Sequence, residues 1–479
     1  MNEKEGYIPK GERKKILLIS DDIRSHSGVA QISREMVINT CHRYNYTTIA
    51  GAVNHPEKGQ CIDLSDNFNQ MSGETDSSVN CYPTNGYGTP EMVRHLIKDE
   101  NPDAIFLITD PRYFVWLFQM ESEIRKNIPI IYLNIWDDYP APMYNKEYYE
   151  SCDMLLGISK QTVNINRLVL GEEKASERIL RYVPHGLNHH TFKPLEKDNE
   201  ELKLFKKQLL GNKEYDFVLL FNSRNIRRKS IPDTLIAWKM FLETLPKSEA
   251  KQCALVLHTD PIDNNGTDLP AVSDYLFGKE ENDIIFSNSK LPTEAMNLLY
   301  NSADGVVLLS SNEGWGLALT EALLSGVPII ANVTGGMQDQ MRFVDSEGKW
   351  FTPDENVPSN HMKTHQEHGE WAFPVFPGAI SCQGSVPTPY IYDDRCSPLE
   401  ASHAMKALYD TSKEERKRIG LKGREWATGD EAGFTSEIMG KRISDAMDKL
   451  FNTWEPRFHY EFLKDTDYER RLLPHKLVY

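Results

Sequence analysis

Cysteine is scarce and unpatterned in this sequence: there are 7 among 479 residues, with no C-x-x-C pair. That spacing argues against a disulfide framework and a zinc site, and it favours reduced thiols in a cytoplasmic setting. Long apolar runs are missing as well, because none approaches the roughly 20 residues of a membrane span. The polar N-terminus lacks the hydrophobic segment of a signal peptide. We therefore expect a soluble, cytoplasmic protein with no stable membrane insertion.

Positive charge is also in short supply. The chain has 54 Lys and Arg against 70 Asp and Glu, a formal net charge of −16. A tight, sequence-independent hold on nucleic acid or on an anionic membrane needs clustered cations, so nucleic acid is a less favoured partner, although a local basic groove is compatible with this balance. The composition, with 40% hydrophobic and 26% charged residues, is that of an ordinary globular protein. Because 479 residues exceed a single hydrophobic core, at least two domains are expected.

The most informative stretch runs from residue 311 to 330, S-N-E-G-W-G-L-A-L-T-E-A-L-L-S-G-V-P-I-I. Apolar runs lie on both sides of it, so the pattern predicts a strand, a glycine-rich turn, a helix and a second strand. Glycines let backbone N–H groups approach a ligand closely, and the first turn of a helix favours an anion such as phosphate. Glu313 lies in the turn and Glu321 in the helix, and we expect them to meet different parts of one ligand. An ionised carboxylate is a strong acceptor for the hydroxyls of a sugar or ribose.

This stretch resembles the signature of the retaining glycosyltransferases of family 4, the glycosyl transferases group 1, which have the GT-B fold. The likeness lies in the E-x7-E spacing, the G-x-G turn and the S-G-V-P exit. It implies an α/β protein with two Rossmann-like, doubly wound domains that face each other across a cleft. It also implies that Glu313 lies by the transferred sugar and acts in catalysis, while Glu321 binds the nucleotide ribose. The turn would contact the substrate through Gly314, Trp315, Gly316 and Leu317.

The expected domains follow from alternating strand-like and helical patterns. Residues 1–193 are expected to form a Rossmann-like domain on the acceptor side, and residues 194–455 one that binds the nucleotide sugar. An insertion at about 345–395 shows no clear periodicity. Its aromatic residues could form a sugar-stacking surface or, as we favour, a small core of their own. The tail, residues 456–479, is expected to return to the first domain.

Several residues of the first domain are candidates for the cleft. Before the first predicted helix the resembling family has paired glycines that face the donor phosphates; here Ser27 replaces one, and only Gly28 carries over, with a simple turn as the alternative. Asp137 and Asp138 stand where the family often has a histidine. We take Asp138 as a catalytic candidate and Asp137 as substrate-binding, and turn formation before Tyr-Pro is the alternative. His185 lies in the crossover between the domains and could line the cleft or pack.

The second domain has cations at the mouth of a strand-to-helix loop, in the sequence N-S-R-N-I-R-R-K-S. Such charges would repel one another without an anion to share. In the family an Arg and a Lys five positions later bind the diphosphate, and Arg224 and Lys229 match this spacing, with Ser230 in place of a following glycine. Arg227 and Arg228 are expected to face solvent.

The family resemblance places the nucleobase in the segment that contains Asn288 and Leu291. The predicted activity is transfer of a hexosyl or pentosyl group, with retention, from a UDP- or GDP-linked sugar to a hydroxyl. The acceptor stays open: a saccharide, a lipid-linked sugar, a small metabolite or a modified nucleobase. No D-x-D motif is evident, so no metal or other cofactor is expected. A nucleotide-sugar epimerase or hydrolase of the same fold, and a non-catalytic nucleotide-sugar-binding protein, are the alternatives.

Overall fold

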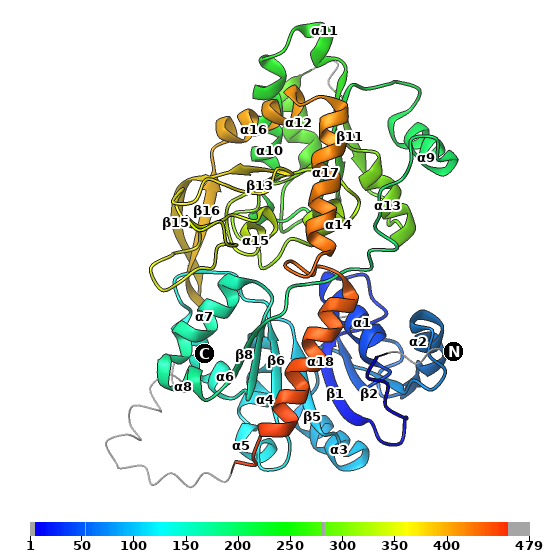
Figure 1. Ribbon diagram of the computed structural model, residues 1–479, viewed down its shortest axis with the longest axis vertical. Coiled ribbons are helices and arrows are strands. Elements are labelled where there is room, and N and C mark those ends of the chain that lie inside the picture. Colours follow the sequence, from blue (N-terminus) through cyan, green and yellow to red (C-terminus); the bar gives the residue numbers. More distant parts are fainter. Residues whose placement is uncertain (1–4, 53, 279–282, 458–479) are drawn as a thin grey trace.

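Two largely parallel sheets, one above the other in Figure 1, form the frame of the computed structural model, which describes residues 5–52, 54–278 and 283–457. Each sheet alternates with helices along the chain, which confirms the predicted pair of doubly wound sheets. The domain division at residues 193 and 194 stays a proposal. Within the described part of the chain, every helix falls short of the length or the apolar character that a bilayer span requires.

The first sheet has eight strands in the order β3-β4-β2-β1-β5-β6-β7-β8, and all neighbours are parallel except β3 and β4. In the middle of the sheet, Ile16 of β1 lies between Tyr46 of β2 and Ala104 of β5. The inner strands are continuous apolar runs because both of their faces are buried. The strands are β1 (Lys14–Asp21), β2 (Tyr44–Gly51), β3 (Ile62–Asp63), β4 (Val79–Pro83), β5 (Ala104–Ile108), β6 (Ile130–Asn134), β7 (Met154–Gly157) and β8 (Ile179–Tyr182).

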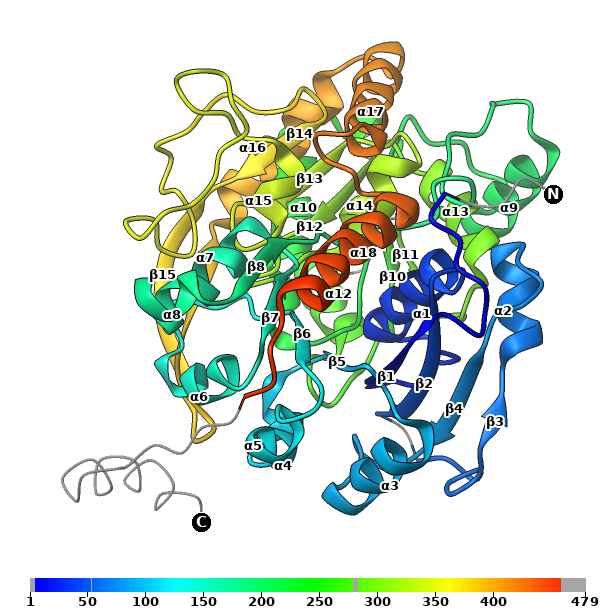
Figure 2. The same ribbon diagram turned by 60° about the horizontal axis from the view of Figure 1, so that its bottom comes forward.

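The helices of this half flank the sheet (Figure 2). Their ends follow ordinary capping chemistry: Thr89 caps α3, a proline opens it, and Asn101 ends it in the left-handed conformation. The helices are α1 (Gly28–Thr40), α2 (Ser65–Ser72), α3 (Pro90–Glu100), α4 (Val115–Phe118), α5 (Glu121–Ile124), α6 (Lys146–Glu150), α7 (Lys160–Leu170) and α8 (Glu172–Ser176).

The second sheet has six strands in the order β11-β10-β9-β12-β13-β14. Helices α10, α12 and α16 pack together, and so do α9, α13, α14 and α17, as expected for layers on opposite faces of the sheet. The strands are β9 (Phe217–Asn222), β10 (Cys253–His258), β11 (Asp283–Ser287), β12 (Gly305–Leu308), β13 (Ile329–Asn332) and β14 (Ala372–Val375). The helices are α9 (Glu200–Leu210), α10 (Ile231–Glu243), α11 (Lys247–Ala250), α12 (Leu269–Phe277), α13 (Thr293–Asn301), α14 (Leu317–Leu324), α15 (Met337–Met341), α16 (Pro398–Asp410) and α17 (Lys413–Thr428).

The insertion expected to be irregular contains a β-hairpin, β15 (Pro377–Ser385) and β16 (Thr388–Cys396). The hairpin extends from the second domain to the first, where Tyr144 Oη donates to the carbonyl of Tyr390 at 2.9 Å. Most of β15 is exposed. Without one buried face, the hairpin shows no alternation of polar and apolar residues that the sequence analysis could detect.

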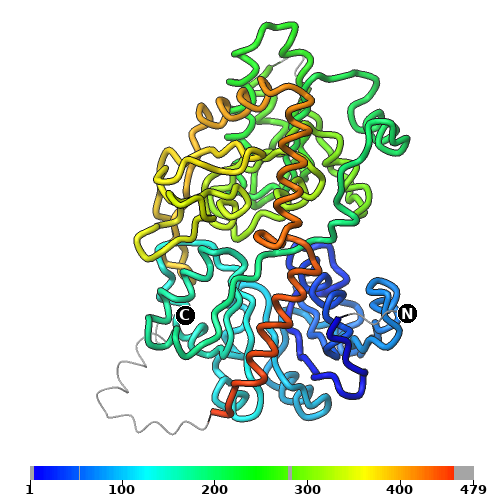
Figure 3. Tube along the Cα trace, in the orientation of Figure 1, coloured from blue at the N-terminus to red at the C-terminus, as the bar shows by residue number. Residues whose placement is uncertain are grey.

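The last helix, α18 (Ser436–Thr453), crosses back onto the first domain (Figure 3). It packs against α1, and Arg43 pairs with Asp448 at 2.8 Å. The return therefore begins before the predicted tail. Residues 458–479 of that tail lie outside the described residues.

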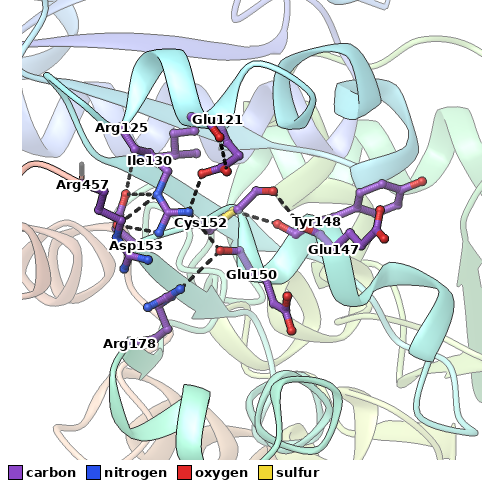
Figure 4. A network of polar contacts seen from close by, with 12 residues as sticks. Glu121, Arg125, Ile130, Glu147, Tyr148, Glu150, Cys152, Asp153, Arg178 and Arg457 are labelled. Atoms are coloured by element: carbon purple, nitrogen blue, oxygen red, sulfur yellow. Dashed lines mark hydrogen bonds and ion pairs between the residues drawn. The ribbon is translucent and has the colours of Figure 1, made fainter. Parts of the chain in front are cut away.

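A network of buried ion pairs holds the end of the described chain (Figure 4). Arg457 Nε lies 3.1 Å from Asp153 Oδ1, and its main-chain N–H donates to the carbonyl of Arg125. Arg125 in turn pairs with Asp153 at 3.0 Å and with Glu121 at 2.7 Å. Burial, with Arg125 nearby, lowers the pKa of Arg457 to about 10. Asp153 thus compensates two guanidinium groups, the buried one of Arg125 and the partly exposed one of Arg457.

Candidate functional site

A pocket of about 1100 Å³ opens between the two sheets, at the carboxyl ends of their strands. Open α/β sheets bind ligands at this edge. The predicted residues that line it are Gly28, Asp137, Asp138, His185, Arg224, Lys229, Glu313, Gly314, Trp315, Gly316, Leu317 and Glu321. Those that line it without having been predicted as site residues include Arg228 and four residues of the hairpin: Gln383, Ile391, Asp393 and Arg395.

Glu313 is the electrostatic centre of this pocket. Lys229 Nζ and Arg228 Nη1 both donate to Glu313 Oε2, the second at 2.8 Å, and Arg228 also donates to the carbonyl of Asn312 at 2.9 Å. Burial alone would raise the pKa of Glu313, but the two cations lower it to about 2. Glu313 is therefore ionised at neutral pH, and two positive groups are held at the ends of β9 and β12.

The turn after β9 explains why these two cations point to Glu313. Residues Arg227–Lys229 form a 3-10 turn, and the main-chain N–H of Ser311 donates to the carbonyl of Arg228 at 2.8 Å, which ties this turn to the Glu313 loop. Ser230 ends the turn with a φ of +50°, in the left-handed region. This is the position where the resembling family has a glycine, and glycine adopts that conformation without strain.

Arg224 lines the pocket but does not contact Glu313, and its role on the diphosphate stays a prediction. Its side chain is 62% exposed, and its Nε donates to Asp263 at 2.9 Å. Arg228, which was expected to face solvent, contacts Glu313 instead. The spacing of the family motif does not predict the direction of each side chain, because the 3-10 turn sets that direction. Lys229 was assigned correctly to the same surroundings as Glu313.

Asp137 and Asp138 lie across the pocket, in the loop after β6. Their main-chain carbonyls accept from Gln161 Nε2 at 2.9 Å and from Trp136 Nε1 at 3.0 Å. Burial raises the pKa of both side chains, and Asp137 raises that of Asp138 further, while Arg228 opposes the shift in both. Asp138 therefore binds a proton far more readily than an ordinary aspartate. Both residues line the pocket, and their roles in catalysis and substrate binding stay predictions.

Glycines allow the two domains to approach closely at this pocket. A Cβ on Gly28, at the start of α1, would lie 3.1 Å from Leu317 Cδ1, at the start of α14. A Cβ on Gly314 would lie 2.8 Å from the carbonyl oxygen of Ile135. Gly316 precedes α14 with a φ of +85°, and no side chain caps this helix. The N–H of Leu319 donates to the carbonyl of Gly316, and the N–H groups before it in the first turn are left for a ligand.

Glu321 forms a separate polar group deeper in the pocket. Tyr300 Oη donates to Glu321 Oε2, and Asn222 Nδ2 lies 2.7 Å from the same hydroxyl oxygen. Burial raises the pKa of Glu321 to about 7, although Tyr300 lowers it. Glu321 is therefore only partly ionised at neutral pH.

His185 and Trp315 line the pocket mainly as packing groups. The indole of Trp315 lies against His185 and Phe434, with ring centroids 6.4 and 4.9 Å away, and its Nε1 donates to Thr320 at 2.8 Å. Burial lowers the pKa of His185 to about 3, so its imidazole is neutral. Its Nδ1 is buried and has no hydrogen-bond partner among the described residues.

Asn288 and Leu291 are not among the residues that line the pocket formed by the described chain. They follow β11, the edge strand, and β10 and β9 separate that strand from β12. These two residues thus lie apart from the cluster around Glu313, and their contact with the nucleobase stays a prediction.

The hairpin forms one wall of the Glu313 pocket, and the sequence analysis did not predict it. Asp393 Oδ1 accepts from Asn312 Nδ2 at 2.9 Å and from Ser311 Oγ at 3.2 Å, so it supports the loop that carries Glu313. The aromatic residues of the insertion do not line the pocket: Trp371 stacks on Trp426 with centroids 5.0 Å apart. Trp426 belongs to α17, so Trp371 packs into the core of the second domain, whereas the favoured alternative was a separate core of the insertion.

Among the described residues, one group of side chains could hold a metal ion: His189, His190 and Glu437, whose ligand atoms lie within 4.8 Å of one another. It lies outside the pocket that contains Glu313. The expectation that the activity needs no metal stays a prediction.

Comparison with known proteins identifies the region that carries the two glutamates. Residues 274–357 match the family described as Glycosyl transferases group 1. The alpha-monoglucosyldiacylglycerol synthase of Acholeplasma laidlawii is 23% identical over 265 residues, which are 54% of this chain and 60% of that protein. The match thus spans less than two thirds of the relative's length.

The fold has counterparts among solved structures. Sucrose-phosphate synthase from Thermosynechococcus elongatus superposes with a TM-score of 0.64 at 17% identity, over 92% of this chain and 100% of that chain. HepE from Anabaena, in complex with UDP-glucose, superposes with a TM-score of 0.61 at 13% identity, over 91% of this chain and 100% of that chain. This chain therefore shares the GT-B fold with these structures, and its residues 274–357 are similar to the Glycosyl transferases group 1 family.

Proposed function

We propose that the protein is a retaining glycosyltransferase of family 4, which transfers a sugar from a nucleoside-diphosphate sugar to an acceptor hydroxyl. The observation that carries this proposal is the contact of Arg228 and Lys229 with Glu313, in a pocket lined by both domains. We place the activity in the cytoplasm, in agreement with the free thiols.

In this reaction the bond between the anomeric carbon and the diphosphate oxygen breaks, and the acceptor oxygen bonds to the same face of that carbon. The acceptor proton passes to the leaving diphosphate. Arg228 and Lys229 stabilise the charge that develops on that diphosphate, and the N–H groups at the start of α14 add to the effect. Glu313 orients the two cations and lies where it can accept from hydroxyls of the sugar.

We propose UDP-glucose as the donor, so that the transfer is hexosyl. The support is the superposition on HepE, a structure that holds UDP-glucose. Glu321 would accept from the ribose hydroxyls once ionised. Because two cations already serve the diphosphate, we propose that the reaction requires no metal, and that EDTA leaves its rate unchanged.

For the acceptor we propose a sugar or lipid-linked hydroxyl that enters beside Asp138 and the hairpin. Asp138 lies across the pocket from Arg228, and Ile391 and Gln383 add a mixed apolar and polar surface there. The Acholeplasma relative is named for a glucosylated diacylglycerol, and this name supports a lipid acceptor as one member of that class.

The experiment is a thermal-shift panel of UDP- and GDP-linked sugars, followed by a release assay for the nucleoside diphosphate with candidate acceptors. We expect UDP-glucose to stabilise the protein, and Lys229→Ala to lower the release rate by about 10²–10³-fold, the usual effect of removing one such stabilising group. Lys126→Ala, an exposed lysine on the first domain, is the control and should retain full activity.

Each other outcome points to another function. Release without a glycosylated product, whatever acceptor is added, would indicate a hydrolase or epimerase. Donor binding without release would indicate a non-catalytic nucleotide-sugar-binding protein. Full activity of Lys229→Ala would remove the basis of the proposal.

A further inference from the structure

A second pocket, of about 680 Å³, lies at the opposite edge of the second sheet. Its lining includes Val218 in β9, Asp304 before β12 and Pro328 before β13, so it is at the amino ends of the strands. The Glu313 pocket is at their carboxyl ends. A volume of this size is typical of small-molecule sites. A ligand in this second pocket would therefore not reach Glu313 or Lys229.

The second pocket is strongly basic, although the whole chain is acidic. Its cations come from the segment around α9 and from the start of α17, both visible in Figure 1, and the acids in its lining are Glu214 and Asp304. The cations are Lys197, Lys203, Lys206, Lys207, Lys213, Lys413, Arg416 and Lys417.

Five of these cations have acidic partners in the structure. Arg416 pairs with Asp304 at 2.9 Å and Lys413 with Asp216 at 3.2 Å. The other pairs are Lys203 with Glu200, Lys213 with Asp283 and Lys417 with Glu196. Within the described ranges, the remaining three form no ion pair: Lys197, Lys206 and Lys207.

The pKa of Lys206 shows that neighbouring cations in this pocket repel one another. Its side chain comes from α9 and is partly buried. Burial lowers its pKa; Asp304 opposes this shift, while Lys197 and Lys413 add to it. Like charges from three segments thus meet at one hollow, although Lys413 also has Asp216 as a partner.

We propose that this second pocket binds a ligand with two phosphate groups. Lysine ammonium groups are compact point charges that bind phosphate oxygens, and a doubly phosphorylated anion would offset the repulsion that Lys206 experiences from Lys197 and Lys413. A free diphosphate compound and the headgroup of a diphosphate lipid share this chemistry. The site is independent of the proposed transfer reaction, because its residues and those of the Glu313 pocket do not overlap.

The test uses the full chain and two probes: inorganic pyrophosphate, measured by calorimetry, and phosphatidylcholine vesicles with and without cardiolipin, measured by co-sedimentation. The pocket variant is Lys197→Gln/Lys206→Gln/Lys207→Gln. Its control has the same net charge: Lys98→Gln/Lys126→Gln/Lys449→Gln, three exposed lysines away from the pocket. The Glu313 pocket is intact in both variants, so a difference between them belongs to the second pocket.

We expect the pocket variant to bind one of the probes at least about tenfold more weakly than the wild type, and the control to stay within about twofold. Three cations lost from the lining of one pocket should weaken binding more than an equal loss of net charge elsewhere. Loss of pyrophosphate binding would identify a free anion as the ligand. Loss of cardiolipin-dependent sedimentation, without pyrophosphate binding by the wild type, would identify a lipid headgroup. Equal binding by both variants, or binding of neither probe by the wild type, would overturn the proposal. Thermal stabilisation by UDP-glucose, measured on the same samples, reports separately on the proposed function.

Discussion

The main-chain N–H of Tyr392 donates a hydrogen bond to the carbonyl of Tyr139. This bond joins the hairpin of the second domain to the loop of the first domain that carries Asp137 and Asp138. Tyr144 adds a second link, because its hydroxyl donates to the carbonyl of Tyr390 and the two rings lie 4.9 Å apart. The hairpin that forms one wall of the Glu313 pocket therefore connects the two domains.

The first prediction concerns this bridge. Tyr144→Phe keeps the ring and removes one hydrogen bond, which should cost about 1 kcal/mol and make release of the hairpin about fivefold more frequent. Proteinase K cleavage near Val386, at the exposed hairpin turn, measures that release. Tyr390→Phe is the control, since Tyr390 accepts through its main chain. Equal cleavage rates in the two variants would show that this bond does not hold the hairpin in place.

The second prediction compares Arg228, which the structure places against Glu313, with Arg224, which matches the spacing of the family motif. Arg228→Ala should lower the rate of nucleoside diphosphate release by about 10²-fold or more, because it removes a cation held against Glu313. Arg224→Ala should change the rate by less than about threefold, since that side chain is exposed and pairs with Asp263. Steady-state kinetics with UDP-glucose compares the two variants. A larger loss in Arg224→Ala would restore the role that the motif spacing suggested.

The sequence predicted those features that depend on local patterns. Apolar runs on both sides of the G-x-G turn placed Glu313 after a strand and Glu321 in a helix, and the structure has this order. Lys229 also follows a strand of the same sheet. Because parallel strands end at one edge, proximity to Glu313 could be inferred without coordinates.

Other features depend on geometry that the sequence does not display. The direction of Arg228 comes from a single 3-10 turn, and the position of Asn288 from the order of the strands. The hairpin was missed because β15 is largely exposed and has no periodic apolar face. Long-range pairs such as Tyr139 with Tyr392 carry no local signal at all.

The third prediction is a pH dependence of donor binding. Burial raises the pKa of Glu321 to about 7, so below that pH the group carries a proton and loses the acceptor strength of a carboxylate. UDP should therefore bind more weakly as the pH falls below about 7, by at most tenfold per pH unit. Titration calorimetry across this range measures the effect.

Two variants test the assignment of this pH dependence to Glu321. Glu321→Gln should bind UDP weakly with a flat pH profile. Tyr300→Phe removes a donor that favours the ionised form, so the midpoint should move to higher pH. An unchanged midpoint in Tyr300→Phe, or a persistent pH dependence in Glu321→Gln, would assign the titration to another group.

The fourth prediction concerns the buried network that holds the chain after α18. Asp153→Ala leaves the buried guanidinium group of Arg125 and the partly exposed one of Arg457 without their shared acid. Such a loss typically costs about 3–5 kcal/mol, whereas Glu121→Ala should cost at most about 1 kcal/mol because that carboxylate is partly exposed. Thermal unfolding should therefore begin at a clearly lower temperature in Asp153→Ala than in Glu121→Ala. If both variants unfold at the same temperature, the return of α18 onto the first domain does not depend on this ion pair. Its packing against α1 and β8 and the Arg43–Asp448 pair would then hold it.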